Sequence, residues 1–129
     1  MQGKGAPVVF VCDDSPVQRE AYRKLLEADY SLRFFTNGES LLEHLRDEQP
    51  ALLLIDINMP GLSGLDTLIE MKARGIDIPL TMVISTEQSK DLIIRSMLVG
   101  AKEYLIKPYR RDDLLERVHA LTRLGLNDA

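Results

Sequence analysis

Residues 51–61 read ALLLIDINMPG, and this stretch decides the predicted fold. Its first five residues are apolar without the alternation of a half-exposed strand, so we expect a central strand of a parallel sheet, buried on both faces. Asp56 follows directly, and a loop containing Pro60 and Gly61 comes next. The stretch therefore predicts a buried strand that delivers a carboxylate to the edge of a sheet.

Three other apolar runs end in polar residues in the same way. They span residues 8–14, 80–86 and 104–108 and end in Asp13 and Asp14, in Ser85 and Thr86, and in Lys107. The carboxyl ends of parallel strands meet at one edge of a sheet. We therefore expect these side chains and Asp56 to share one crevice.

Apolar segments alternate with segments of helical periodicity along the chain, which is typical of an α/β fold with a parallel sheet covered on both faces. We expect strands at residues 8–12, 32–35, 51–55, 80–84 and 103–106. We expect helices at residues 16–28, 64–74, 88–99 and 112–124, and one that carries Leu41, Leu42 and Leu45 on a single face. Ser15 is the predicted cap of the first helix, and Gly100 the predicted end of the fourth.

Length and composition indicate one globular domain. The chain has 129 residues, of which 45% are hydrophobic and 28% charged. We place the domain at residues 7–125, between a flexible tail at 1–6 and a short tail at 126–129. No apolar run has transmembrane length and no secretory signal is evident, so we expect a cytoplasmic protein without a membrane partner. The net charge of −4 argues against direct binding of nucleic acid.

The acidic residues at the predicted edge need a counter-charge. Two carboxylates ~4 Å apart repel each other by roughly 4 kcal/mol at an effective dielectric constant near 20. Either one carboxyl group takes up a proton, or a divalent cation binds, and we favour Mg²⁺ because it prefers hard oxygen ligands. The simpler alternative is that Asp13 and Asp14 cap the first helix, but Ser15 already suits that role and capping would not account for Asp56.

A carboxylate beside Mg²⁺ and an ammonium group can attack phosphorus, because both cations stabilise charge on the transferring oxygens. Asp56 is the candidate nucleophile, Lys107 the candidate partner of a phosphoryl oxygen, and Ser85 and Thr86 candidate hydrogen-bond donors. Each has a simpler interpretation: an acid that begins a turn, a surface lysine, and caps of the next helix. Their common position favours the functional interpretation.

Asp13-Asp14, Asp56 with Met59-Pro60-Gly61, Ser85-Thr86 and Lys107-Pro108 together closely resemble the receiver domain of two-component response regulators. The resemblance covers nearly the whole chain. It implies a flavodoxin-like, doubly wound fold, with a five-stranded parallel sheet in the order 2-1-3-4-5 and five helices. It also implies that Asp56 accepts a phosphoryl group from a histidine kinase or a phosphotransfer protein.

The resemblance assigns further roles. Asp14, Asp56 and the backbone carbonyl of Asn58 would ligate Mg²⁺, and Asp13 would act largely through water. Lys107 would pair with the phosphoryl group, the Ser85 hydroxyl would donate a hydrogen bond to it, and the peptide bond before Pro108 would be cis. The only chemistry would be self-phosphorylation from a donor and slow hydrolysis, so we do not expect a turnover enzyme.

Tyr104 matches the family's switch aromatic. Phosphorylation would draw the Ser85 hydroxyl inward, the Tyr104 ring would turn toward the vacated space, and the surface of the fourth helix, fifth strand and fifth helix would change for a downstream protein or an output domain not in this chain. The fourth helix has an apolar arc wider than one sheet contact needs, so either part of it awaits a partner or the whole arc is buried. Its members are Leu92, Ile93, Ile94, Met97 and Leu98.

Several residues depart from the family pattern or lie away from the predicted edge. Thr86 stands where the family often has alanine, and Asn58 and Glu87 occupy positions that tune dephosphorylation. His44 and His119 are predicted to be surface or packing residues, and Cys12 a buried hydrophobe. The alternatives are a pseudo-receiver that binds partners without phosphorylation and a Mg²⁺-dependent aspartyl phosphatase. The Asp-x-Asp motif of the latter is missing here.

Overall fold

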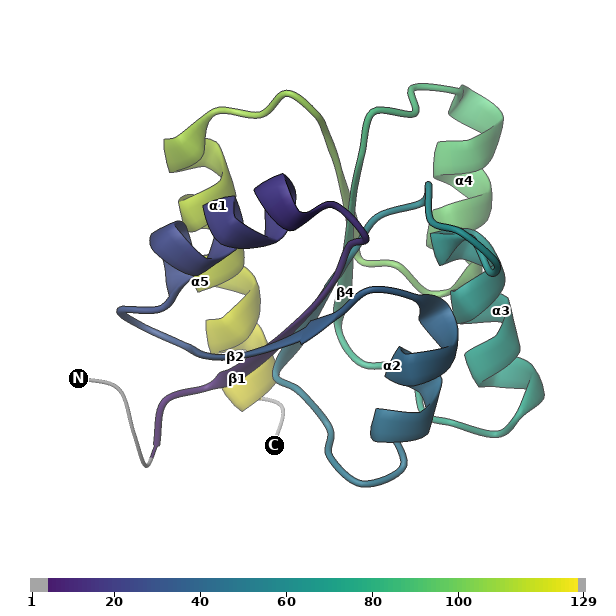
Figure 1. Cartoon of the computed structure of the whole chain (residues 1–129), viewed down its shortest axis with the longest axis horizontal. Coiled ribbons are helices and arrows are strands. Elements are labelled where there is room, and N and C mark those ends of the chain that lie inside the picture. The colour runs from purple at the N-terminus through teal and green to yellow at the C-terminus, as the bar shows by residue number, and fades with distance from the viewer. Residues whose placement is uncertain (1–4, 128–129) are drawn as a thin grey trace.

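The computed structural model describes residues 5–127, with side chains through Arg123. Within these residues, five parallel strands form one sheet in the order β2-β1-β3-β4-β5, and five helices surround it (Figure 1). The strands are β1 (Val8–Cys12), β2 (Ser31–Phe35), β3 (Leu52–Ile55), β4 (Thr81–Ser85) and β5 (Glu103–Ile106). The helices are α1 (Pro16–Leu26), α2 (Gly38–His44), α3 (Gly64–Ala73), α4 (Lys90–Val99) and α5 (Arg111–Asn127). The strand order implied by the resemblance is confirmed.

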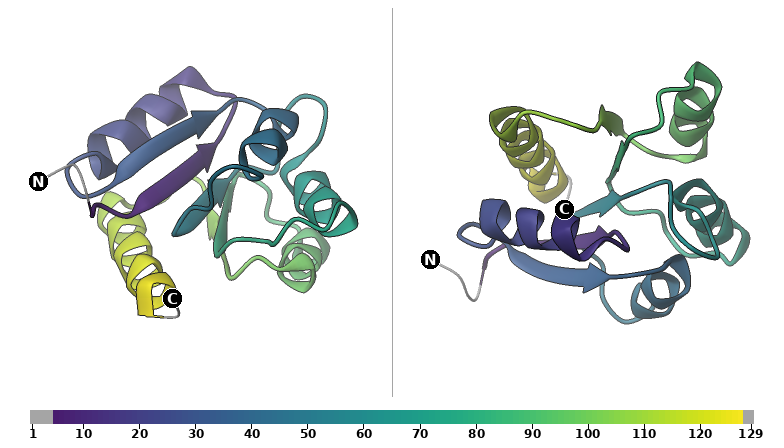
Figure 2. Two further views of the ribbon diagram at one scale, coloured as in Figure 1. Left: turned by 90° about the horizontal axis from the view of Figure 1, so that it is seen from below. Right: turned by 45° about the horizontal axis from the view of Figure 1, so that its top comes forward.

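The helices cover both faces of the sheet. Helices α1 and α5 pack on one face, and α2, α3 and α4 on the other (Figures 1 and 2). Successive strand residues point to opposite faces, so each strand contributes to two apolar layers. The layer under α1 and α5 contains Val9, Val11, Leu52, Leu54, Met82 and Ile84, and the other contains Phe10, Cys12, Leu53, Ile55 and Val83. All of β3 is buried, as predicted for a central strand.

The predicted capping residues act as expected. The Ser15 hydroxyl accepts a hydrogen bond of 3.2 Å from the amide of Gln18 at the start of α1. Gly100 ends α4 with a φ angle of 131°, which residues with a side chain rarely adopt. These two residues fix how the chain leaves β1 and how it enters β5.

Some predicted boundaries were wrong by one to three residues. Helix α4 begins at Lys90 instead of residue 88, because the Ser89 hydroxyl accepts a hydrogen bond from the amide of Leu92 and so caps the helix there. Helix α1 ends at Leu26 instead of residue 28. The last helix runs from Arg111 to Asn127 instead of from 112 to 124.

Two further predictions concern the chain ends and membranes. Residues 1–4 of the predicted tail at 1–6, and residues 128–129 of the tail at 126–129, lie outside the described residues. Among the residues that are described, no helix is both long and apolar enough to cross a bilayer.

Candidate functional site

Three strand ends meet at the carboxyl edge of the sheet. Asp13 follows β1, Asp56 follows β3 and Lys107 follows β5. The Lys107 Nζ atom lies 3.0 Å from Asp13 Oδ2 and 2.9 Å from Asp56 Oδ2. The side chains of Lys107 and Asp56 are each 11% exposed and that of Asp13 is 2% exposed, so bulk water screens these ion pairs little. The structure thus brings together two predicted carboxylates and the predicted lysine.

The ammonium group of Lys107 supplies a counter-charge that both carboxylates need. Its burial opposes the charged form, but hydrogen bonds to Asp56 and Asp13 outweigh that effect and raise the pKa of Lys107. Lys107 is therefore protonated throughout the neutral range. The peptide bond between Lys107 and Pro108 is cis, as the resemblance implied.

The second oxygen of each buried carboxylate is also occupied. Asp13 Oδ1 accepts a hydrogen bond of 3.0 Å from the amide of Ser15, and Asp56 Oδ1 accepts one of 3.1 Å from the amide of Asn58. Each donor lies two residues after its acceptor, which is the local pattern of an Asx turn. The turns fix the orientation of both carboxylates before any ligand arrives.

Asp14 stands apart from this arrangement. Its side chain is exposed, whereas Asp13 is buried. In the described part of the chain, no three or more side chains from His, Cys, Asp and Glu are grouped closely enough to hold a metal ion. Asp13 and Asp56 instead direct one oxygen each toward the same cation, the ammonium of Lys107.

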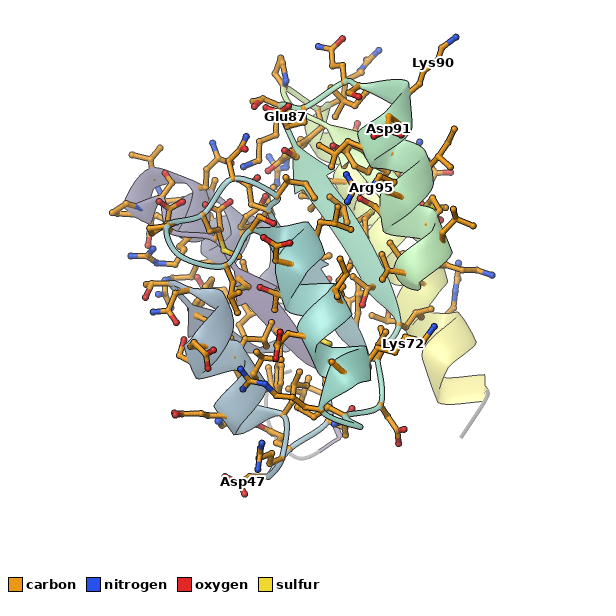
Figure 3. All side chains as sticks on the ribbon, turned by 90° about the vertical axis from the view of Figure 1, so that its right-hand side faces the viewer. Asp47, Lys72, Glu87, Lys90, Asp91 and Arg95 are labelled. Atoms are coloured by element: carbon orange, nitrogen blue, oxygen red, sulfur yellow. The ribbon has the colours of Figure 1, made fainter. Side chains whose placement is uncertain are left out.

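Glu87 connects Asn58, Ser85 and Tyr104. Asn58 Nδ2 donates to Glu87 Oε2 over 3.3 Å, and the Glu87 amide donates to the Ser85 hydroxyl over 3.2 Å. The Tyr104 hydroxyl donates to the Glu87 carbonyl over 2.8 Å. Glu87 lies in the loop that leads to α4 (Figure 3). It therefore joins the loop after Asp56 to the end of β4 and to β5.

Ser85, Thr86 and Tyr104 differ in accessibility. Ser85 is fully buried at the end of β4, whereas the next residue, Thr86, is exposed. Tyr104 is half-buried, as predicted for an aromatic residue of a strand. Burial raises the pKa of Tyr104, so its hydroxyl remains a neutral donor to Glu87.

The sequence predictions assign no role at the site to two residues that support it. Arg19 Nη1, on the first turns of α1, donates to the Asp13 backbone carbonyl over 3.0 Å. Gly64, the first residue of α3, packs directly against the backbone carbonyl of Asp56, where a Cβ atom would overlap it. Arg19 carries no local signal for this contact, whereas a glycine that opens a helix beyond a strand-end acid could have suggested close packing.

Cys12 and the two histidines occupy the places predicted for them. Cys12 is fully buried, and burial raises the pKa of its thiol to about 12, so it is not a nucleophile at neutral pH. His44 packs near Phe10 and hydrogen-bonds Glu48, and His119 lies against Tyr30. None of these three residues takes part in the ion pairs of the acidic site.

Comparison with known proteins identifies relatives of this chain. Residues 9–119 match the family model of the response regulator receiver domain. The chain is 31% identical over 116 residues to the response regulator MprA of Mycobacterium avium, and equally so to that of Mycobacterium tuberculosis. Each match covers 89% of this chain and 50% of the relative. The chain thus spans about half the length of these relatives.

Solved structures show the same fold. A CheY-like receiver domain from Methanospirillum hungatei superposes with a TM-score of 0.87 at 21% identity, covering 97% of this chain and 100% of that one. The receiver domain of a LuxO repressor protein from Vibrio parahaemolyticus gives 0.86 at 22% identity, covering 95% and 94%. With the family match over residues 9–119, the protein belongs to the receiver domains of response regulators.

Proposed function

We propose that this chain is a phosphoacceptor switch in which Asp56 takes a phosphoryl group from a histidine kinase or a phosphotransfer protein. The observation that carries the proposal is the bridge from Lys107 to Asp13 and Asp56, which come from separate strands. The carboxylate of Asp56 therefore has a cation beside it that can stabilise negative charge on a transferring phosphoryl group. Membership of the receiver family supports the same assignment.

Mg²⁺ is the metal that suits this edge. Every candidate donor is an oxygen atom, and the Oδ2 atoms of Asp13 and Asp56 already converge on one cation. Mg²⁺ commonly binds one or two carboxylates and keeps several waters, so it does not require three grouped side chains, and its candidate donors are Asp13, Asp14, Asp56 and the Asn58 carbonyl. When bound, the ion would neutralise charge on the phosphoryl oxygens. A Mn²⁺-bound form is known for the structurally similar response regulator Rcp1 (TM-score 0.74, 23% identity, covering 89% of this chain and 91% of Rcp1).

The transfer balances with the residues present. A carboxylate oxygen of Asp56 forms a bond to phosphorus while the bond from phosphorus to the donor's imidazole nitrogen breaks, and the electron pair leaves with the imidazole. Lys107 pairs with the new phosphoryl oxygens. Ser85 supplies a hydroxyl donor and Thr86 a backbone donor. Water later attacks phosphorus and releases inorganic phosphate, and Asn58 and Glu87 influence how that water approaches.

The output passes through Glu87 and Tyr104. The Ser85 hydroxyl accepts a hydrogen bond from the Glu87 amide, and Tyr104 donates to the Glu87 carbonyl. If the Ser85 hydroxyl turns to the phosphoryl group, its hydrogen bond from the Glu87 amide is altered. The loop then moves, and with it the Glu87 carbonyl that binds the Tyr104 hydroxyl. The surface of α4, β5 and α5 then presents a different face to a downstream protein or an output domain.

The proposal is tested by measuring the intact mass of the protein after incubation with acetyl phosphate and Mg²⁺. We expect one added phosphoryl group, its loss in Asp56→Asn, and its loss when EDTA removes Mg²⁺. A protein that gains no mass under any condition would contradict the proposal and favour a pseudo-receiver. Turnover of a general phosphomonoester would instead support the aspartyl phosphatase.

A further inference from the structure

Two tyrosines stack on each other between α1 and the loop that follows Lys107. Tyr22 lies on α1 and is 1% exposed, and Tyr109 lies in the loop between β5 and α5. Their ring centroids are 6.4 Å apart and the ring planes differ by 14°, so the rings are stacked. Tyr109 follows Lys107 by only two residues. The stack therefore joins α1 to the segment that carries the lysine of the site.

The stack is close to the charges of the site. Burial raises the pKa of both phenols, and the negative charge of Asp13 adds to the effect on each. On the same helix, Arg19 binds the backbone carbonyl of Asp13. Helix α1 thus contacts the site at two points: Arg19 binds Asp13, and Tyr22 stacks on Tyr109, two residues after Lys107.

Residues 107–109 form the segment that carries the lysine, and few other contacts fix the position of their backbone. The Lys107 amide donates to the Ser85 carbonyl over 2.8 Å, which fixes its start, and Pro108, which follows, is exposed. A lysine side chain has a flexible four-carbon stem, so the backbone position decides where its ammonium group can reach. Tyr109, which is partly buried, is the first side chain after Lys107 that packs against the apolar core.

We propose that Tyr22 and Tyr109 are positioning residues that hold Lys107 where its ammonium group can pair with the oxygens of the phosphoryl group. The inference rests on the proposed function for its kinetic consequence. A displacement of about 1 Å at a reacting group can cost up to about a hundredfold in rate. Loss of the stack therefore lowers the maximal rate of phosphorylation, whereas the donor concentration that gives half of that rate changes little.

The test compares Tyr109→Leu, which removes the stacked ring, with Tyr109→Phe, which keeps it. We expect the maximal rate of adduct formation from acetyl phosphate to fall about tenfold in the first variant and to stay within about twofold in the second. Tyr22→Leu gives the same loss, and the double variant loses no more than either single one, because both remove one interaction. Since Tyr22 is a core residue, Tyr109→Leu is the variant expected to fold most readily.

Tyr30→Leu is the matched control. Tyr30 belongs to the same apolar layer and pairs with the ring of His119 at 5.8 Å, but it precedes β2, at the opposite edge of the sheet. It should leave the rate unchanged. Equal slowing by Tyr30→Leu, or a wild-type rate in Tyr109→Leu, would overturn the inference.

A second readout needs no phosphorylation. The ¹³Cε resonance of Lys107 in the unmodified protein reports on the ammonium group between the two carboxylates. We expect this resonance to shift in Tyr109→Leu and to stay in place in Tyr109→Phe and Tyr30→Leu. If the wild-type chain formed no adduct, the proposed function would fail, and this resonance would still decide the inference. An unchanged resonance in Tyr109→Leu would overturn it.

Discussion

Helices α4 and α5 stand on either side of β5 in the sequence, yet they are held to the sheet very differently. Helix α5 buries Leu114, Val118 and Leu121 almost completely. Of the ten residues of α4, Ser96 alone is buried, and three large apolar side chains are exposed. These are Ile94, Met97 and Leu98, at 57%, 41% and 78%.

The contrast indicates which side of the molecule can move. An element with few buried apolar contacts opens at lower free energy than one packed into the core. Figure 3 shows Lys90 projecting outward from the start of α4, and the Asp91–Arg95 ion pair is long, at 3.9 Å. Helix α1 likewise buries Tyr22 and Leu26, so we expect α1 and α5 to act as a rigid support of the acidic site and α4 to be the helix that responds to it.

The largest effect we expect comes from truncating one leucine on each helix. Leu114→Ala leaves a cavity in a closed core and should lower the free energy of unfolding by about 2–5 kcal/mol. Leu98→Ala removes an exposed side chain and should change it by less than about 0.5 kcal/mol. Urea unfolding followed by circular dichroism measures both. A large loss in Leu98→Ala would remove the contrast between the helices.

Lys107→Met tests how much the charge of Lys107 contributes to the free energy of unfolding and how that contribution depends on pH. Hydrogen bonds to charged groups contribute about 1.5–3 kcal/mol, and we expect the variant to lose free energy of unfolding of this order at pH 7. Because the pKa of Lys107 is raised above its ordinary 10.5 in the folded state, its contribution is full below pH 10.5 and is lost as the pH rises through the folded-state value. The stability difference between wild type and variant should therefore shrink at high pH.

The matched control for this pH series is the exposed Lys102. The difference in free energy of unfolding between wild type and Lys102→Met should not shrink between neutral and strongly alkaline pH. Urea unfolding at each pH gives the free energies. A gap between wild type and Lys107→Met that persists at the highest pH would contradict the role assigned to the ammonium group.

Gly64→Ala tests how tightly α3 holds the acceptor residue. A Cβ atom at Gly64 would overlap the Asp56 carbonyl, whereas one at Gly38 would overlap the side chain of Thr67, outside the site. Each substitution forces neighbours to move and should cost about 1–3 kcal/mol. Gly64→Ala alone should slow phosphorylation of the folded protein. Equal rates in both variants would show that α3 does not position Asp56.

The smallest effect concerns Tyr104. Tyr104→Phe removes the hydrogen bond to the Glu87 carbonyl, and Tyr30→Phe removes one of 2.9 Å to Thr122. Each should cost about 0.5–1.5 kcal/mol. Amide hydrogen exchange should quicken at residues 86–92 in Tyr104→Phe only. Unchanged exchange there would mean that Tyr104 does not hold the loop before α4.

The sequence predicted the strands and the meeting of charges well, for a local reason. Buried parallel strands are short apolar runs, and the residues that follow them must lie at one edge, so the positions of Asp13, Asp56 and Lys107 could be inferred from the pattern. The apolar arc of α4 was also inferred from periodicity, and the exposure of Ile94 and Leu98 confirms that it exceeds what the core needs.

The contacts that the sequence did not predict are between side chains distant in the chain. Tyr22 and Tyr109 each match the local pattern of an ordinary core residue, and their stacking depends on how α1 lies against the loop after β5. The bridging position of Lys107 depends likewise on side-chain conformation. The sequence predicted a counter-charge for the carboxylates and favoured Mg²⁺, and the structure adds that the lysine pairs with two of the three.

The most direct test of the account is amide hydrogen exchange with and without acetyl phosphate and Mg²⁺, with Asp56→Asn as the reference. Phosphorylation should change exchange in the segment from residue 86 through α4 and β5, should leave α1 unchanged, and should have no effect in Asp56→Asn. An adduct that forms while exchange changes equally on α1 and α4, or in neither, would contradict the division between a rigid support and a responsive helix.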